Sequence, residues 1–234
     1  MSDFLNQKKN SAGCSECDKG LIRKRNEDGF GFESAIYCDC FIESESLTHS
    51  ASLLKVSNIS ERFIKRYDAT KWVQPKDLDF DTLDAMLSED TIEKNWLFFY
   101  GPAGTGKTYA SIVAAKIAVL REKEVFFATV PDLLNMLRPS GTEAEGNIRY
   151  IAMRNCKLAD LLILDDIGQE KSSQWVREQL YIIINHRYNE GLPTIFTSNF
   201  PLSRIETNIS SAVHSRIKAE ATVVDFTPEE NRRV

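Results

Sequence analysis

The feature that most constrains the fold of this chain is the phosphate-binding motif G-x-x-x-x-G-K-[ST] at residues 101–108. A short apolar run at residues 96–100 predicts a buried strand before the motif, and the alanine-rich residues 109–120 predict a helix after it. In this order of elements, the backbone N–H groups of the loop and the N-terminus of the helix face an anion. The sequence therefore predicts a nucleotide-phosphate site in which Lys107 reaches the β- and γ-phosphates and Thr108 ligates Mg²⁺. The other residues expected to line this site are Gly101, Pro102, Ala103, Gly104, Thr105, Gly106 and Tyr109.

Two acidic residues follow a second apolar run further along the chain. Residues 161–164 predict a buried strand, and Asp165 and Asp166 come directly after it. Because Mg²⁺ parts with its waters reluctantly, Asp165 is expected to hold the ion through its water shell. Asp166 is expected to orient or deprotonate the attacking water. An acidic pair alone is typical of a solvated turn, and it is the preceding phosphate-binding motif that favours a catalytic role.

The pattern of apolar segments predicts an α/β fold with a parallel sheet. Expected strands and helices alternate along the chain, which is typical of a parallel sheet covered by helices on both faces. The strands are expected near residues 96–100, 125–129, 161–165, 194–198 and 222–226, and the helices near 107–121, 131–137, 147–158 and 173–189. The 234 residues divide into a cysteine module at 1–42, a serine-rich linker at 43–60 and a nucleotide-binding domain at 61–234.

Four of the five cysteines lie close together near the N-terminus, at Cys14, Cys17, Cys38 and Cys40. Two such pairs around a short glycine- and aromatic-rich segment are typical of a tetrahedral zinc site on a small β-hairpin. The second pair is C-x-C rather than C-x-x-C, so His49 remains an alternative fourth ligand. Unligated or redox-active cysteines and an iron–sulfur cluster are the competing interpretations.

Two further polar residues are candidates for the phosphate site. Asn199 follows the expected strand at 194–198, where its amide either holds the attacking water or caps a turn. Arg216 lies on a short helical stretch, and its guanidinium is suited to stabilise phosphoryl-transfer charge in its own site or in that of a neighbouring subunit. A solvated surface arginine is the other interpretation of Arg216.

The formal net charge of −5 gives no global reason to expect nucleic-acid binding. Contact with single-stranded DNA then has to come from local groups, for which Arg138, Arg149, Tyr150 and Arg154 are candidates, although each also fits a solvated helix surface. No apolar run approaches the length of a membrane span, and the N-terminus lacks the apolar core of a signal peptide. We therefore expect a cytoplasmic protein without membrane contact.

The motifs GPAGTGKT, LLILDDIG, TIFTSN and HSRI occur in this order within residues 60–234. In sequence and spacing, this region resembles the AAA+ ATPases of the DnaC/DnaI type, which load replicative helicases, and their close relative, the transposition ATPase IstB. The cysteine module ahead of it is similar to the zinc-binding N-terminal domain of DnaI-type and phage-encoded loaders.

The resemblance assigns Walker A to Lys107 and Thr108, Walker B to Asp165 and Asp166, and sensor 1 to Asn199. It implies that Arg216 is an arginine finger that acts in trans. It also implies that Arg232 is the sensor 2 arginine, with Arg233 as the alternative.

Two features depart from the common AAA+ pattern. The second Walker B acid is Asp166 where most members carry glutamate, and its shorter side chain predicts slow turnover. Only eight residues follow Phe226, so no C-terminal helical lid is expected, and a neighbouring subunit or a partner is expected to close the nucleotide in.

The resemblance implies an ATPase that uses ATP, Mg²⁺ and Zn²⁺ and forms an ATP-dependent homo-oligomer. Its partners are expected to be a DnaB-type hexameric replicative helicase, held by the cysteine module, and single-stranded DNA. The alternative is an IstB-like ATPase that binds double-stranded DNA and a transposase. A separate recruiting module favours the loader.

Overall fold

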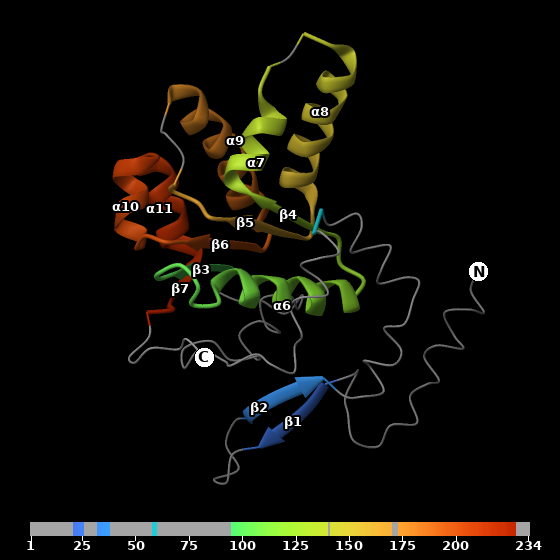
Figure 1. The fold of residues 1–234 in the computed structure, drawn as a ribbon, viewed down its shortest axis with the longest axis vertical. Coiled ribbons are helices and arrows are strands. Elements are labelled where there is room, and N and C mark those ends of the chain that lie inside the picture. Colours follow the sequence, from blue (N-terminus) through green and yellow to red (C-terminus); the bar gives the residue numbers. More distant parts are fainter. Residues whose placement is uncertain are drawn as a thin grey trace, which may run out of the picture.

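The computed structural model describes residues 21–25, 32–37, 58–59, 95–139, 141–169 and 173–227 (Figure 1). The larger part of it is a parallel sheet with helices on both faces. The strands of this sheet are β3 (Trp96–Tyr100), β4 (Val125–Thr129), β5 (Leu161–Asp165), β6 (Thr194–Ser198) and β7 (Ala221–Asp225). The helices are α6 (Lys107–Leu120), α7 (Val130–Leu137), α8 (Glu143–Leu158), α9 (Gln174–Glu190), α10 (Leu202–Asn208) and α11 (Ser211–Glu220). The predicted α/β fold is therefore confirmed, although the sequence pattern did not predict α10.

The order of the strands brings distant motifs to one edge of the sheet. The order is β4-β5-β6-β3-β7, and each neighbouring pair is parallel. Because all these strands run the same way, their carboxyl ends lie at a common edge, where open α/β sheets bind ligands. β6 lies between β3, which leads into the phosphate-binding loop, and β5, which ends at Asp165. The loop, the acidic pair and the residue after β6 are therefore neighbours in space.

The two faces of the sheet are covered unequally (Figure 1). On one face, Leu97 and Phe99 of β3 pack with α6, whose buried alanines let the helix lie close to the sheet. On the other face, Trp96 and Phe98 pack with residues of α7, α8, α9, α10 and α11. Successive side chains of β3 thus enter two different apolar cores, which explains why the strand is apolar at every position.

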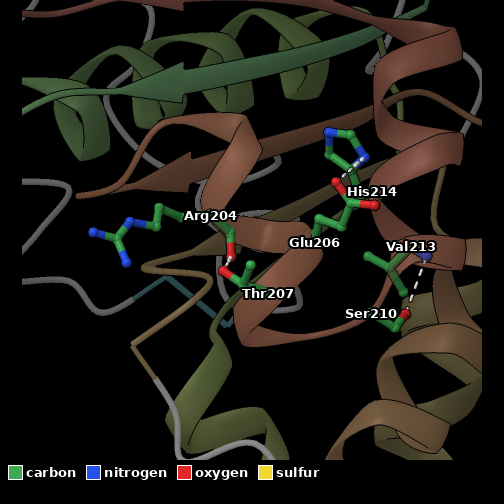
Figure 2. Close-up of polar contacts among 6 residues, drawn as sticks. All are labelled: Arg204, Glu206, Thr207, Ser210, Val213 and His214. Carbon is green, nitrogen blue, oxygen red and sulfur yellow. Dashed lines mark hydrogen bonds and ion pairs between the residues drawn. The ribbon is translucent and has the colours of Figure 1, made fainter.

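Short-range polar contacts lie within and between helices α10 and α11 (Figure 2). Ser210 caps α11, because its Oγ accepts a hydrogen bond from the N–H of Val213 at 3.2 Å. The carboxylate of Glu206 on α10 lies 3.8 Å from Nδ1 of His214 on α11. Val213 is fully buried and anchors the helix in the core. Helix α11, which carries Arg216, thus begins with a side-chain cap and packs on the core through Val213.

A buried cation ties α9 to two neighbouring elements. The side chain of Arg187 is fully buried, and burial lowers its pKa to about 9, which leaves it charged at neutral pH. Its guanidinium donates to Thr194 Oγ1 at 2.9 Å and to the carbonyl oxygens of Cys156, Lys157, Ala159 and Pro193 at 3.1, 3.2, 2.8 and 2.6 Å. Arg187 therefore satisfies carbonyl groups at the C-terminal end of α8 that the helix leaves without partners.

The expected β-hairpin between the two cysteine pairs is confirmed. Strand β1 (Leu21–Arg25) pairs antiparallel with β2 (Phe32–Tyr37), and Leu21 lies opposite Tyr37. The residues for which zinc binding or a sensor 2 role is predicted lie outside the described residues, namely Cys14, Cys17, Cys38, Cys40, His49, Arg232 and Arg233.

Two residues of the expected linker contact the sheet. Ile59 is 5% exposed and belongs to the core on the α6 face. Asn58 donates from Nδ2 to the carbonyl oxygen of Phe127 on β4 at 3.1 Å. The nucleotide-binding domain thus includes contacts from residues before 61. In the described ranges, every helix is too short or too polar to cross a membrane.

Candidate nucleotide-binding site

The loop between β3 and α6 begins along a path that only glycine allows. Gly101 has a φ of 147°, and a Cβ at this residue would lie 2.9 Å from the carbonyl carbon of Phe226. Its N–H donates to the carbonyl oxygen of Ser198 at 3.2 Å, which fixes the loop to the end of β6. Gly104 and Gly106 have φ values of 82° and 98°, in the region that favours glycine. The glycines therefore let this loop curl around an anion.

Lys107 is the first residue of α6, and its ammonium group lies inside the loop. Nζ donates to the carbonyl oxygens of Gly101 and Pro102, each at 2.8 Å, and to Oδ1 of Asn199 at 2.9 Å. The residue is 5% exposed, and this burial lowers the pKa of Lys107. The neighbouring carboxylates of the acidic pair act in the opposite direction. The loop thus holds a desolvated cation whose hydrogen-bond partners among the described residues are neutral.

The N-terminus of α6 is open to an anion. Gly106 is the N-cap residue and has no side chain that caps the first turn, and N–H donors at the N-terminus of a helix favour an anion. Thr105 does not cap the helix, because its hydroxyl donates to the carbonyl oxygen of Pro102 at 2.9 Å. Ala103 and Gly104 are exposed at the tip of the loop. Together with the buried ammonium group, these donors fit the phosphates of a nucleotide.

Thr108 and Asp165 form the second part of the site, where β5 ends beside α6. The hydroxyls of Thr108 and Thr197 both donate to Oδ1 of Asp165, at 2.9 and 2.6 Å. Burial raises the pKa of Asp165, whereas hydrogen bonds from Thr197 and Thr108 lower it. A carboxylate beside a hydroxyl provides the oxygen ligands that Mg²⁺ prefers. The pair therefore fits the Mg²⁺ of a nucleotide complex.

Asp166 occupies a backbone conformation that is uncommon for a residue other than glycine, with a φ of 61°. Its N–H donates to Oγ1 of Thr197 at 2.9 Å, and the N–H of Ile167 donates to the carbonyl oxygen of Thr197 at 2.9 Å. Gln169 donates from Nε2 to Oδ1 of Asp166 at 3.0 Å. The turn after β5 is thus held against β6, and the position of Asp166 depends on that strand.

The structure brings together the predicted residues Lys107, Thr108, Asp165, Asp166 and Asn199. Sequence reasoning missed Thr197 and Ser198, which connect β6 to the acidic pair. The hydroxyl of Ser198 donates to the carbonyl oxygen of Ile167 at 2.7 Å. The one available signal was the position of both residues in the motif TIFTSN, directly before Asn199.

Two other predicted residues lie apart from this cluster. Tyr109 follows on α6 and packs against the core on that face. Arg216 lies on α11, and its hydrogen bonds within the described ranges go to Tyr181 and Asn185 of α9 and to Ala212 of α11. Arg216 is therefore not part of its own subunit's phosphate site in this arrangement.

Helix α8 projects beyond the sheet together with α7 (Figure 1). Its buried side is narrow and includes Ala152 and Cys156, and Cys156 is a free cysteine of the core. The residues Ile148, Tyr150 and Ile151 are 51%, 70% and 53% exposed. The basic candidates are also exposed, namely Arg138 at the C-cap of α7 and Arg149 and Arg154 on α8. The outer side of α8 thus carries basic, aromatic and aliphatic side chains.

The strand order, the phosphate-binding loop after β3 and the acidic pair at the end of β5 define an ATPase of the AAA+ class. The chain belongs to the family of IstB-like ATP binding proteins, which matches residues 43–233. The predicted family is therefore confirmed, and ATP with Mg²⁺ is the ligand that the family and the site imply.

The chain is similar to proteins of replication and of transposition. It is 31% identical over 105 residues to the replicative helicase loader DnaI of Bacillus subtilis, a match that covers 44% of this chain and 33% of DnaI. It is 30% identical over 149 residues to an ATP-binding protein assigned to insertion sequence IS5376 of Geobacillus stearothermophilus, which covers 63% of this chain and 57% of that protein. A crystal structure of DnaI superposes with a TM-score of 0.59 at 25% identity, over 75% of this chain and 95% of that one. The matches to both curated relatives therefore span less than two thirds of their lengths.

Proposed function

We propose that this protein is a cytoplasmic, ATP-dependent loader of a hexameric replicative helicase onto single-stranded DNA, and that it acts as a homo-oligomer during replication initiation. The observation that carries the proposal is the division of the ATP site. The loop, the acidic pair and Asn199 lie together in one subunit, whereas Arg216 is fixed on a separate helix. A second copy of the chain then has to supply the arginine, so hydrolysis depends on assembly. The similarity to DnaI supports this use of the ATPase.

Within one subunit, the residues around the loop bind and orient ATP. Lys107 exchanges its carbonyl and Asn199 partners for phosphate oxygens, which releases the Asn199 amide to orient the attacking water. Thr108 and, through the water shell of the ion, Asp165 would hold Mg²⁺, which would supply positive charge to the phosphates when it is bound. Asp166 orients that water and accepts its proton.

Arg216 acts in trans in this proposal. Its guanidinium stabilises the charge that develops on the phosphoryl group in the next subunit's site, which an arginine finger does in other phosphoryl-transfer enzymes. Arg232 is the proposed sensor 2 residue, with Arg233 as the alternative.

The outer side of α8 is the proposed contact for single-stranded DNA. Tyr150 offers an exposed ring on which a base stacks, and the neighbouring Arg149 and Arg154 track the phosphates. Such binding weakens as salt rises, because each phosphate contact releases counterions.

The cysteine module is proposed to bind Zn²⁺ and to recruit the helicase. The pairing of Leu21 with Tyr37 supports this arrangement, because it brings the two ends of the hairpin together. One cysteine pair comes before the hairpin and the other after it, as a tetrahedral site on a small hairpin requires. Cys14, Cys17, Cys38 and Cys40 are the proposed ligands, with His49 in place of Cys40 as the alternative.

Capture by purified partners tests the proposed function against an IstB-like ATPase, the alternative that the insertion-sequence relative favours. Full-length protein with ATP is incubated with a hexameric replicative helicase or with a transposase, and with single- or double-stranded DNA. A loader captures the helicase and prefers single strands. Capture of the transposase and preference for duplex DNA supports the alternative.

The same assay tests the recruiting role of the cysteine module. Full-length protein with Cys38→Ser and Cys40→Ser is expected to lose zinc and helicase capture and to keep ATP binding, because metal and phosphate sites use different residues. Metal analysis by mass spectrometry accompanies the capture. Retention of zinc contradicts the proposed ligands, and undiminished capture by the zinc-free variant contradicts the recruiting role.

A further inference from the structure

The guanidinium of Arg216 lies in a cradle formed by one face of α9. Nε donates to Oδ1 of Asn185 at 2.9 Å, and one terminal nitrogen donates to the hydroxyl of Tyr181 at 3.2 Å. The other terminal nitrogen donates to the carbonyl oxygen of Ala212 on α11 at 3.0 Å. The guanidinium carbon lies 4.8 Å from the ring centroid of Tyr181 and 5.7 Å from that of Tyr188. The guanidinium is therefore held by hydrogen bonds from its three nitrogens and by contacts with two aromatic rings.

The cradle is a feature of the helix surface. Tyr181, Asn185 and Tyr188 are separated by four and three positions, so they share one face of α9. Both tyrosines are 38% exposed, whereas the core side of the helix is made by other residues. Aromatic rings and an arginine at an exposed helix surface are the side chains that protein interfaces favour. The cradle thus lies where a second subunit has access to it.

Within the part of the chain that the structure describes, the hydrogen bonds of Arg216 leave part of its guanidinium available. An arginine side chain has about five N–H donors in a planar fork, and the cradle occupies one on each nitrogen. The remaining donors lie on the two terminal nitrogens, which suffices for a bidentate contact with a phosphate. Because its orientation is already fixed, the side chain loses little conformational entropy when it meets that anion.

We propose that Tyr181, Asn185 and Tyr188 are positioning residues, which hold Arg216 in the orientation in which its free donors reach the phosphate of the ATP bound to a neighbouring subunit. This inference rests on the proposed trans-acting role of Arg216. It adds that the rate of hydrolysis depends on side chains of α9 that touch neither nucleotide nor Mg²⁺.

The test compares Asn185→Ala and Tyr181→Phe with wild type as full-length proteins, at a protein concentration that saturates assembly. Each removes one acceptor of Arg216, and Tyr181→Phe keeps the ring. Each is expected to lower kcat for ATP hydrolysis about three- to tenfold. The KM for ATP should change less than about twofold, because ATP is held by the other subunit's loop. Asn185→Asp retains an acceptor for Nε and should lie closer to wild type than Asn185→Ala. The control Gln174→Ala, on the same helix, loses only an exposed hydrogen bond to Glu178 and should leave kcat unchanged.

Two further measurements separate the possible failures. Arg216→Ala that keeps wild-type hydrolysis overturns the trans role itself, and the cradle with it. If Arg216→Ala is inactive but Asn185→Ala and Tyr181→Phe are fully active, or faster than wild type, the cradle does not position the arginine. In a mixture with Lys107→Ala, whose cradle is intact, the Asn185→Ala subunits should regain hydrolysis. A loss of kcat that this mixture does not restore, despite co-assembly, marks a role in the stability of α9 and overturns the proposal.

Discussion

Lys107 and Arg216 are two cations with a proposed role at a phosphate, and the protein holds them in contrasting ways. Lys107 is 5% exposed and bonds to carbonyl oxygens of its own loop, five and six residues away in sequence. Arg216 is half-buried at the surface and bonds to side chains of another helix, 31 and 35 residues away. The site of Lys107 thus starts from a local motif, to which Asn199 adds a distant partner, whereas the site of Arg216 depends mainly on how two helices pack.

The contrast predicts a separation of binding from turnover. We expect changes around Lys107 to act on affinity within a single chain, because the loop contains donors for its own nucleotide. We expect changes around Arg216 to act on the rate within an assembly, because that residue lies outside its own site. Arg187 on α9 is a third cation. Within the described residues it donates to Thr194 and to backbone carbonyl groups, so it serves as the comparison for a structural role.

Arg216→Ala is the most severe test of this separation. Loss of an arginine finger is expected to lower hydrolysis about 10³–10⁵-fold while ATP binding is kept. Steady-state ATPase assays and nucleotide titration check both halves of this expectation. In a mixture with Lys107→Ala, the intact finger of one variant should serve the intact loop of the other and restore activity. The exposed arginine of α10 provides the control, and if Arg204→Ala also loses hydrolysis, the finger has been assigned to the wrong residue.

Arg187→Met should have the opposite effect to Arg216→Ala, because it should lower the stability of the protein rather than its rate of ATP hydrolysis. The substitution leaves carbonyl groups at the end of α8 without a donor, and the free energy of unfolding should fall by about 1–3 kcal/mol for each carbonyl group that stays unpaired. Chemical denaturation measures the change. Arg187→Lys keeps the charge but not the planar fork, so it should recover only part of the loss. A stable Arg187→Met protein with impaired hydrolysis would show that this cation serves the site after all.

Lys107→Ala should weaken ATP binding about 100-fold, because the charge-assisted hydrogen bonds of one ammonium group are lost. The fold should remain, since the partners of Lys107 in the absence of ATP are groups near the exposed loop. Isothermal titration measures affinity, and circular dichroism checks the fold. Lys218→Ala, an exposed lysine on α11, serves as the control. Affinity within a few-fold of wild type would contradict the assignment of the loop.

Asp165→Asn should stabilise the protein slightly in the absence of nucleotide. Burial raises the pKa of Asp165 above its ordinary 3.8, so the folded state binds this proton more readily than the unfolded state. The cost of burying the charge is fully present above the raised pKa and disappears as the pH falls towards 3.8. The free energy of unfolding of the variant should therefore exceed that of wild type by about 1 kcal/mol at neutral pH, and this difference should become smaller as the pH falls. Chemical denaturation at several pH values measures this difference in the free energy of unfolding. A difference that grows at low pH would contradict this account.

The sequence was informative where the chain uses local signals. The glycines and Lys107 of the loop, the run that ends at Asp165 and the apolar strands each have a pattern within a few residues, and the structure places all of them as expected. Helix α10 was missed because it is short, and its one fully buried apolar side chain is Ile205. Thr197 was missed because its role arises from a contact with Asp165 across 32 residues. The surroundings of Arg216 were equally hidden, since its partners come from a different helix.

The close approach of Gly101 to Phe226 places the phosphate site against a segment that is translated long after the loop itself. Strand β7 comes after every other strand of the described sheet, and the contact between Tyr100 and Asp225 spans 125 residues. Because β7 pairs with β3 and Phe226 lies against Gly101, we expect the loop to reach its final shape only after β7 has joined the sheet. A chain interrupted before Ala221 contains the whole motif but lacks this strand, so we expect it to bind ATP more weakly than the finished domain.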